Sequence, residues 1–146
     1  MSGAPSSLGV GGARLIPLPE YRDLRGTLVV GEFANQVPFA PVRFFVVHGV
    51  PPGVSRGYHA AVNCDQLLVA VAGSVHIGID DGIEEHSCLL DSRRTALCLP
   101  RNTFCWQHDF SPDAVLLVLA SEIYELTEYV SDRAEYRRRK IKAETP

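Results

Sequence analysis

The feature that most constrains the fold is a rhythm of short apolar runs separated by turn residues. The runs end at glycine, proline or Asp-Gly clusters and occupy residues 27–33, 42–48, 66–72, 95–99 and 114–120. A spacing of ~8–12 residues between such runs is typical of antiparallel sandwiches and barrels. After Ser121 charged residues interleave with aromatic ones. We therefore predict an all-β fold, an antiparallel β-barrel of the jelly-roll type, with a short C-terminal helix.

The length and net charge of the chain limit its domain count and the kinds of partner it can have. The chain has 146 residues, enough for one domain with a real core, and a formal net charge of −3. This balance gives no reason to expect a nucleic acid or membrane partner, and no run reaches the ~20 apolar residues of a membrane span. The four cysteines form no C-x-x-C pair, which favours reduced thiols over a zinc site. Residues 1–13, small and glycine-rich, are predicted to be a disordered arm, and residues 14–146 a single domain.

Residues 52–74 contain a pattern of residues that is typical of a functional site. Arg56 and His59 lie on a predicted strand, Gln66 opens the next, and Gly73 ends it. The spacing resembles the first motif of a cupin β-barrel. Alternate residues of a strand share a face, so His59 and Ala61 should point the same way.

A catalytic metal is not expected. The resemblance to cupins implies a ligand set of two histidines, a glutamate and a later histidine. The corresponding positions here hold His59, Ala61, Gln66 and Cys105. One imidazole without a carboxylate lacks the charge and coordination number that a hard or borderline divalent ion needs. We predict neither metal nor cofactor.

His59 is then the main candidate for acid–base chemistry, because imidazole titrates near neutrality. The alternative is a core histidine that only satisfies its hydrogen bonds. Arg56 is placed to bind an oxyanion or phosphate at the barrel mouth. Arg43 opens an apolar strand and faces either the rim or the mouth. His108, before a turn, is a candidate second acid.

Nearly the whole ordered chain resembles one family, the nucleotide-sugar 3,4-ketoisomerases, also called the WxcM-like or FdtA/QdtA-like cupins. The similarity extends over residues 15–136, and it rests on Asp23-x-Arg25-Gly26, Arg56-Gly57-x-His59-Ala60, Gln66, Gly73-Ser74, Asp80-Asp81-Gly82, His108-Asp109-Phe110-Ser111 and Val118-Leu119-Ala120-Ser121-x-x-Tyr124. It implies a cytoplasmic homodimer of metal-free cupin barrels. The implied reaction moves the carbonyl of dTDP-4-keto-6-deoxyglucose from C4 to C3 through an enediol. The implied substrate contacts include Arg25, Arg43, Arg56, Gln66, Tyr58 and Cys105.

Four positions depart from the family pattern. The usual His-x-His ends here at Ala61, and the usual tyrosine after the strand arginine is Phe45. A Trp-His pair on the later strand is replaced by Phe104 and Cys105. The pocket thus lacks one histidine and one phenol that the resemblance implies. The residues predicted to take over the role of a missing group are Cys64, Cys105, Tyr58 or His108.

Three functions follow from this pattern. The first is a sugar-nucleotide ketoisomerase with a rebuilt acid–base pair. Its diphosphate site is favoured because Arg25, Arg43 and Arg56 are all retained. The second is a repurposed cupin isomerase or cyclase for a less polar secondary metabolite, favoured by an apolar wall at positions 45, 61 and 104. The third is a non-catalytic ligand-binding barrel.

Overall fold

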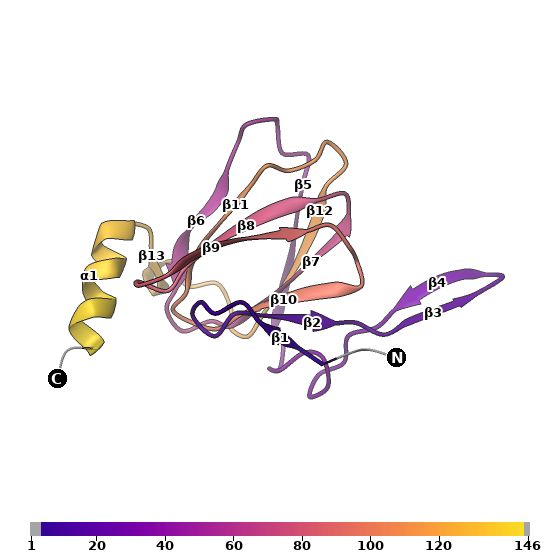
Figure 1. The fold of residues 1–146 in the computed structure, drawn as a ribbon, viewed down its shortest axis with the longest axis horizontal. Coiled ribbons are helices and arrows are strands. Elements are labelled where there is room, and N and C mark those ends of the chain that lie inside the picture. Colours follow the sequence, from indigo (N-terminus) through magenta and orange to yellow (C-terminus); the bar gives the residue numbers. More distant parts are fainter. Residues whose placement is uncertain (1–3, 145–146) are drawn as a thin grey trace.

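Two antiparallel sheets form the body of the protein in a computed structural model that describes residues 4–144 (Figure 1). One sheet has six strands in the order β1-β2-β10-β7-β12-β5, and the other has five in the order β13-β6-β11-β8-β9. The strands of the first are β1 (Ser6–Ser7), β2 (Arg14–Pro17), β10 (Thr95–Leu99), β7 (Gln66–Ala72), β12 (Val115–Ala120) and β5 (Arg43–His48). Those of the second are β13 (Tyr129–Val130), β6 (Arg56–Ala61), β11 (Phe104–His108), β8 (Val75–Asp80) and β9 (Glu85–Leu90). The predicted all-β fold is confirmed, as is the C-terminal helix α1 (Arg133–Glu144).

The main core lies between the two sheets. Apolar side chains alternate inward along each strand, and they meet in one buried cluster that includes Leu68, Leu97, Leu116, Ile77 and Ile79. Each of these five side chains is at most 2% exposed. Burial of a Leu or Ile side chain contributes roughly 1.5–3 kcal/mol. The core therefore fixes the inward and outward faces of the strands that hold the site.

The predicted strand boundaries are most accurate in the middle of the chain, where β7 and β10 match the expected ranges of 66–72 and 95–99. The Gly73-Ser74 turn between two strands predicts a hairpin, and this prediction is wrong, because β7 and β8 belong to different sheets. Both edges of β7 are already occupied, by β10 and β12. Gly73 has φ +63°, and a Cβ there would meet Ser111 and Ala114, so the tight turn needs glycine. The turn carries the chain from one sheet to the other.

The disordered arm predicted for residues 1–13 is wrong for residues 4–13. Strand β1 pairs with β2, and Val10 and Ala13 are 2% and 0% exposed in the core. The Gly11 amide donates to the Asp81 carboxylate across 3.0 Å. Glycines with φ of +58° to +74° make the tight loop that the composition suggested was flexible. Residues 1–3 lie outside the described residues.

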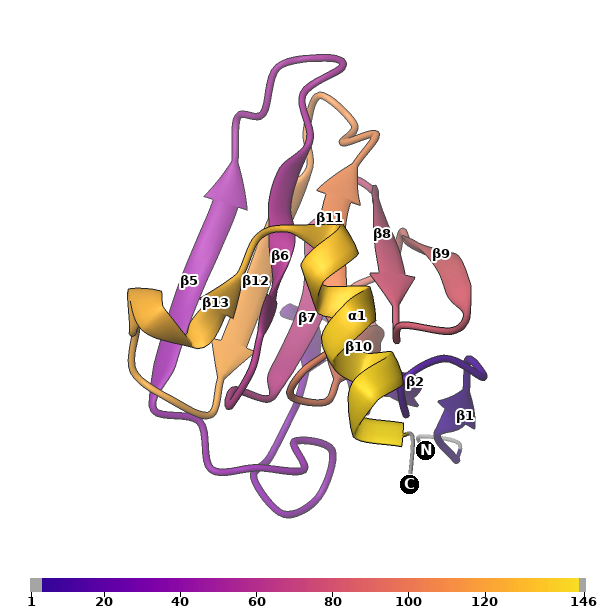
Figure 2. The same ribbon diagram turned by 90° about the vertical axis from the view of Figure 1, so that its left-hand side faces the viewer.

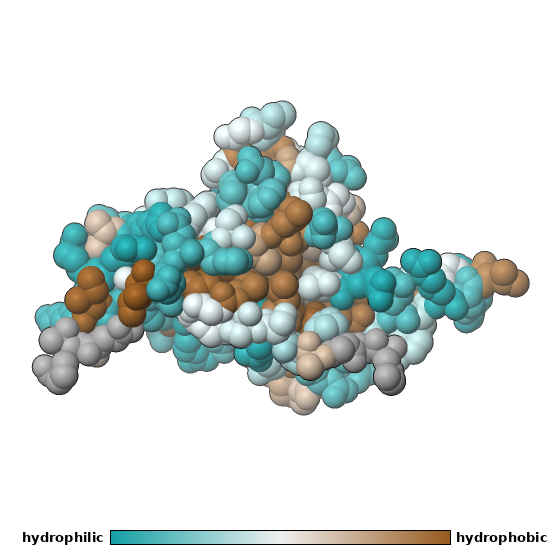
Figure 3. All heavy atoms as spheres, in the orientation of Figure 1, coloured by the Kyte–Doolittle hydropathy of each residue, from teal (hydrophilic) through white to brown (hydrophobic). Residues whose placement is uncertain are grey.

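A hairpin formed by β3 (Glu20–Asp23) and β4 (Gly26–Val29) projects from the body as a separate two-stranded sheet (Figure 1). The strand expected over residues 27–33 ends at Val29, because residues 32–37 form a local turn closed by backbone bonds. The tip is hydrophobic in Figure 3, and Leu24, Tyr21 and Leu28 are more than half exposed. The hairpin has no other described strand beside it.

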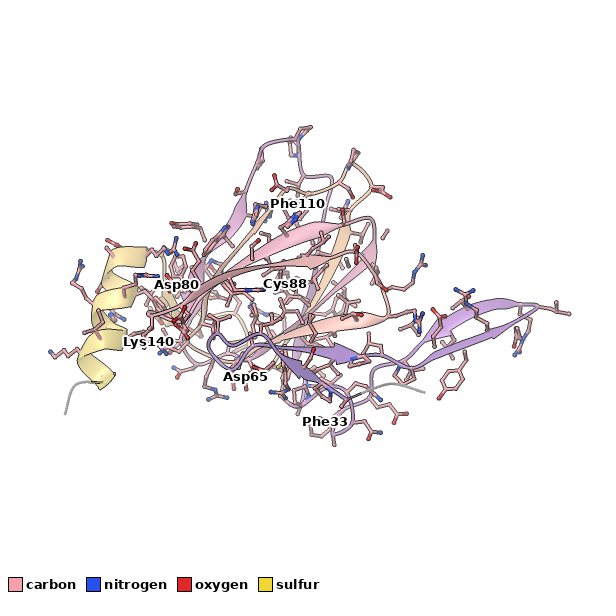
Figure 4. The ribbon with its side chains drawn as sticks, in the orientation of Figure 1. Phe33, Asp65, Asp80, Cys88, Phe110 and Lys140 are labelled. Atoms are coloured by element: carbon pink, nitrogen blue, oxygen red, sulfur yellow. The ribbon has the colours of Figure 1, made fainter. Side chains whose placement is uncertain are left out.

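Helix α1 lies across the outer face of the five-stranded sheet (Figure 2). Beneath it Asp80 is fully buried and accepts hydrogen bonds from Arg133 Nε (2.7 Å) and Arg137 Nε (2.8 Å). Figure 4 labels Asp80 and, on the helix, Lys140. A short 3₁₀ turn, η1 (Leu126–Glu128), precedes β13. Within residues 4–144, no helix has the length and apolarity to cross a bilayer.

Candidate functional site

A cavity of about 330 Å³ opens where β5, β6 and β7 meet the segment that follows β12. Each strand places one or two side chains in its wall, and residues 124–131 supply the rest. The lining residues are Arg43, Phe45, His59, Gln66, Tyr124, Leu126, Tyr129 and Ser131. Among the predicted site residues, His59, Arg43 and Gln66 are thus brought together at one cavity.

His59 lies on the inner face of β6, directly across from Cys105 of β11. Its ring meets the ring of Tyr129 edge to face, with centroids 4.5 Å apart. Burial lowers the pKa of His59 below its ordinary value of 6.5, because desolvation disfavours the imidazolium. The imidazole is consequently neutral near pH 7 and able to accept a proton.

Arg43 brings a positive charge to the same cavity. Its guanidinium lies 5.4 Å from the centre of the Phe45 ring and 5.6 Å from that of Tyr124. Its Nη2 donates a hydrogen bond to the Tyr129 hydroxyl across 3.2 Å. The buried Nε has no hydrogen-bond partner among residues 4–144. The aromatic rings hold the guanidinium in place and leave it with donor capacity for an anionic or carbonyl oxygen.

Arg56 shares the inner face of β6 with His59 despite their odd spacing. The pairing of β6 with β11 slips between Cys105 and Gln107, so that three residues of β6 span two of β11. Gly57, with φ +87°, absorbs the extra residue. Arg56 then lies opposite Gln107, which is buried on the inner face. The guanidinium is exposed and is not part of the cavity wall, so Arg56 stands outside the site.

Two predicted site residues lie on the opposite face of the same sheet. Tyr58 packs against Phe104 and Trp106 beneath α1, with centroids 5.0 and 5.8 Å away. His108 stacks on His76 at 5.3 Å and contacts the side chains of Ser87 and Asp109. The strand period of two separates both from His59.

Cys105 and Arg25 also lie away from the cavity wall. Cys105 is buried in the main core, and desolvation raises the pKa of its thiol to about 12, so it is an unreactive thiol. Arg25 lies at the tip of the β3–β4 hairpin, where its side chain is 90% exposed and pairs with Asp23. The predicted apolar wall is confirmed at Phe45, whereas Phe104 points outward and packs against Tyr136.

Residues 124–131 build half of the cavity, and the sequence did not predict this contribution. Tyr124, Leu126 and Tyr129 come from a segment that was expected to lead directly into the helix. The signal available was that Tyr124 and Leu126 lie between the glutamates at 122, 125 and 128 and that Tyr129 follows the last of them. This segment instead runs from the six-stranded sheet to the five-stranded sheet, where Tyr129 of β13 pairs with Ala61 of β6.

The described side chains at the site do not form the donor set of a metal centre. Among residues 4–144, no three His, Cys, Asp or Glu side chains converge as ligands. The cavity itself contributes one imidazole and no carboxylate or thiol. The absence of a metal stays a prediction from this donor chemistry.

The two sheets, with a cavity lined by residues of both, define a cupin-like fold. A family profile described as WxcM-like, C-terminal, matches residues 11–141, and the chain belongs to this family. It is 33% identical over 117 residues to a TDP-4-oxo-6-deoxy-alpha-D-glucose-3,4-oxoisomerase of Aneurinibacillus thermoaerophilus, covering 80% of this chain and 84% of that protein. The predicted family is confirmed.

Solved structures agree with this placement. A 3,4-ketoisomerase from Helicobacter canadensis superposes with a TM-score of 0.85 at 30% identity, covering 88% of this chain and 97% of the other. A mutant of the 3,4-ketoisomerase QdtA from Thermoanaerobacterium thermosaccharolyticum, in complex with TDP-4-keto-6-deoxyglucose, gives 0.86 at 28% identity, with 92% and 97% covered. The chain is thus homologous to TDP-sugar 3,4-ketoisomerases.

Proposed function

We propose that this protein is a sugar-nucleotide 3,4-ketoisomerase that acts on dTDP-4-keto-6-deoxyglucose or a close relative. The observation that carries the proposal is a neutral, half-buried imidazole, His59, in the wall of a 330 Å³ cavity beside the Arg43 guanidinium. Homology to TDP-sugar ketoisomerases supplies the substrate class. No metal takes part in the proposed reaction.

The isomerisation requires a base that removes the proton from C3. It also requires a group that stabilises the negative charge developing on the C4 oxygen. In the proposal the neutral imidazole of His59 removes the C3 proton. Arg43, with an unpartnered Nε, donates to a substrate oxygen as the enediol forms. Gln66, 8% exposed in the cavity wall, adds a polar amide that can orient the sugar.

The diphosphate needs a cation outside the sugar pocket. Arg56 suits this role, since it is exposed beyond the cavity wall yet on the same face of β6 as His59. Guanidinium groups bind phosphate oxygens through paired hydrogen bonds. In this arrangement Arg43 contacts the sugar end and Arg56 contacts the diphosphate.

We also propose a homodimer, on the strength of the projecting β3–β4 hairpin. An isolated two-stranded hairpin is marginally stable in water, and its edges are unpaired. Its exposed Tyr21, Leu24 and Leu28 give it an apolar surface. The body offers a matching surface in Phe44 and Val46, which are 68% and 44% exposed on the outer face of the six-stranded sheet. A second copy covers both surfaces. A monomeric mass by light scattering at micromolar concentration contradicts this arrangement.

A second candidate function is an isomerase or cyclase for a less polar metabolite. It is favoured by the aromatic part of the wall, Phe45, Tyr124 and Leu126. The two candidates differ in their need for a diphosphate. The test is to incubate the protein with dTDP-4-keto-6-deoxyglucose and to follow the sugar protons by NMR. We expect conversion to the 3-keto isomer, together with a rise in Tm on adding dTDP. No conversion and no thermal shift at millimolar dTDP favour the second candidate.

A further inference from the structure

The family histidine at position 61 is alanine in this chain, and the cavity contains a phenol beside that position. Tyr129 lies on β13, which pairs with β6 so that Tyr129 stands directly across from Ala61. Directly opposed residues of an antiparallel pair point to the same face. Ala61 shares that face with His59, so the tyrosine ring fills the space next to the catalytic candidate.

Contacts at both ends of the Tyr129 side chain fix it in the cavity. Its ring meets the His59 ring edge to face at 4.5 Å, and it also contacts the Tyr124 ring at 5.6 Å. Its hydroxyl accepts a hydrogen bond from Arg43 Nη2 across 3.2 Å. A cationic donor on the phenol oxygen stabilises the phenolate that forms when the proton leaves. None of the four residues first considered as replacements, Cys64, Cys105, Tyr58 and His108, lines this cavity.

We infer that Tyr129 is the second acid–base residue of the site and exchanges protons with the substrate oxygens, while His59 exchanges protons with the substrate carbons. The inference rests on the proposed ketoisomerase function. Nothing in the geometry requires a second histidine. One imidazole and one phenol are sufficient if each of them acts twice.

The proton balance closes with these two groups. His59 takes the C3 proton, the C3–H electron pair becomes the C3=C4 bond, and the C4 carbonyl oxygen takes the Tyr129 proton. The enediol is then flanked by an imidazolium and a phenolate. Tyr129 takes the O3 proton, the O3–H pair forms the C3 carbonyl, and C4 takes the proton back from His59. Both residues return to their starting states, and one carbon is reduced while its neighbour is oxidised.

This sequence of steps has a stereochemical consequence. The same imidazole removes the proton from C3 and delivers it to C4, so both transfers occur on one face of the sugar. The alanine at position 61 suits such a mechanism, because no imidazole on the β6 strand competes for the second transfer.

The test compares Tyr129→Phe with Tyr58→Phe in turnover of dTDP-4-keto-6-deoxyglucose. Phenylalanine keeps the ring against His59 and removes only the hydroxyl. Tyr58 is a matched control, since its phenol is on the same strand as His59 but on the outer face of the sheet. We expect Tyr129→Phe to lower kcat at least 50-fold and to keep the thermal shift with dTDP. Tyr58→Phe should stay within about twofold of wild type.

Three outcomes overturn the inference. A loss of less than 50-fold in Tyr129→Phe shows that the hydroxyl is not the proton carrier, although the ketoisomerase function stands. Loss of the dTDP shift along with turnover shows that Tyr129 is a structural residue. A wild-type protein that does not turn over the substrate removes the proposed function, and the inference fails with it.

Discussion

The inner and outer faces of the five-stranded sheet each carry an imidazole, with opposite surroundings. His59, on the inner face, contacts aromatic rings and faces a cavity, and burial lowers its pKa. His108, on the outer face, stacks on another histidine and contacts Asp109 and Ser87. Within residues 4–144, the first environment gives the imidazole an aromatic contact and no hydrogen-bond partner. The second satisfies both ring nitrogens of His108 within the protein.

The difference shows that the surroundings of a histidine decide whether it can exchange a proton with a substrate. Its position before a turn, which suggested His108 as a second acid, does not. Proton transfer to a substrate needs a free nitrogen at a cavity. The outer face uses its polar groups to hold α1, through the buried Asp80 and two arginines. The same strands therefore carry the candidate site on one side and hold a helix on the other.

The largest expected effect separates the two histidines directly. His59→Asn should lower kcat at least 100-fold, because asparagine keeps hydrogen-bonding capacity but cannot titrate near neutrality. His108→Asn should stay within about threefold. Steady-state kinetics of both variants on dTDP-4-keto-6-deoxyglucose checks this. Equal losses in the two variants would remove the distinction between the faces.

Asp80→Asn tests the structural side of the comparison. Burial opposes ionisation of Asp80, but hydrogen bonds from Arg137 and Arg133 hold its pKa below the usual value. Loss of one partner of a buried pair costs about 3–5 kcal/mol, and partial exposure of the arginines reduces this to about 2–3 kcal/mol. Urea unfolding at pH 7 should show that drop. The matched control is Asp23→Asn in the exposed pair with Arg25, which should leave the midpoint unchanged.

The pH dependence of that effect has a definite sign. The folded-state pKa of Asp80 is depressed, so its contribution is present above the unfolded value of about 3.9 and is lost as pH falls through the folded value. The difference in unfolding free energy between wild type and Asp80→Asn should therefore shrink below about pH 4. A difference that grows in acid contradicts the pairing of Asp80 with the arginines.

Nucleotide binding should show a smaller effect, divided between two arginines. At ten times its Kd, dTDP adds about 1.4 kcal/mol to the stability of the folded state. Arg56→Ala should remove most of the resulting rise in Tm if Arg56 holds the diphosphate. Arg43→Ala should reduce it less, because Arg43 lies in the sugar pocket. The reverse order would place the diphosphate inside the cavity.

The smallest expected effect concerns the pH dependence of activity. Burial lowers the pKa of His59, so kcat/KM should fall in acid with a midpoint below 6.5. A midpoint above 6.5 would mean that a different group, or a charged neighbour, controls the reaction. The profile is measured in buffers of constant ionic strength.

The sequence was sufficient to predict most of the longer strands and the half of the site that they carry. Apolar runs and turn residues predict β7 and β10 closely, and the spacing around His59 identifies the main candidate. The face of the sheet on which each side chain lies was predicted less well, because it depends on how the strands pair with one another. Tyr58 is one residue from His59 and points the other way, whereas Arg56, three residues away, shares its face because of the irregularity at Gly57. The contribution of Tyr129 depends on a two-residue strand that no local pattern indicates.

The central claim is that His59 removes a carbon-bound proton on the inner face. It is tested most directly by solvent deuterium exchange into dTDP-4-keto-6-deoxyglucose, followed by proton NMR with wild type and His59→Asn. The proton held by the His59 imidazolium exchanges with solvent, so the wild type should place deuterium at C4 as it isomerises the sugar. His59→Asn should bind dTDP normally and show exchange at least 100-fold slower. Exchange at the wild-type rate in His59→Asn would contradict the account and leave His59 as a residue of the barrel wall.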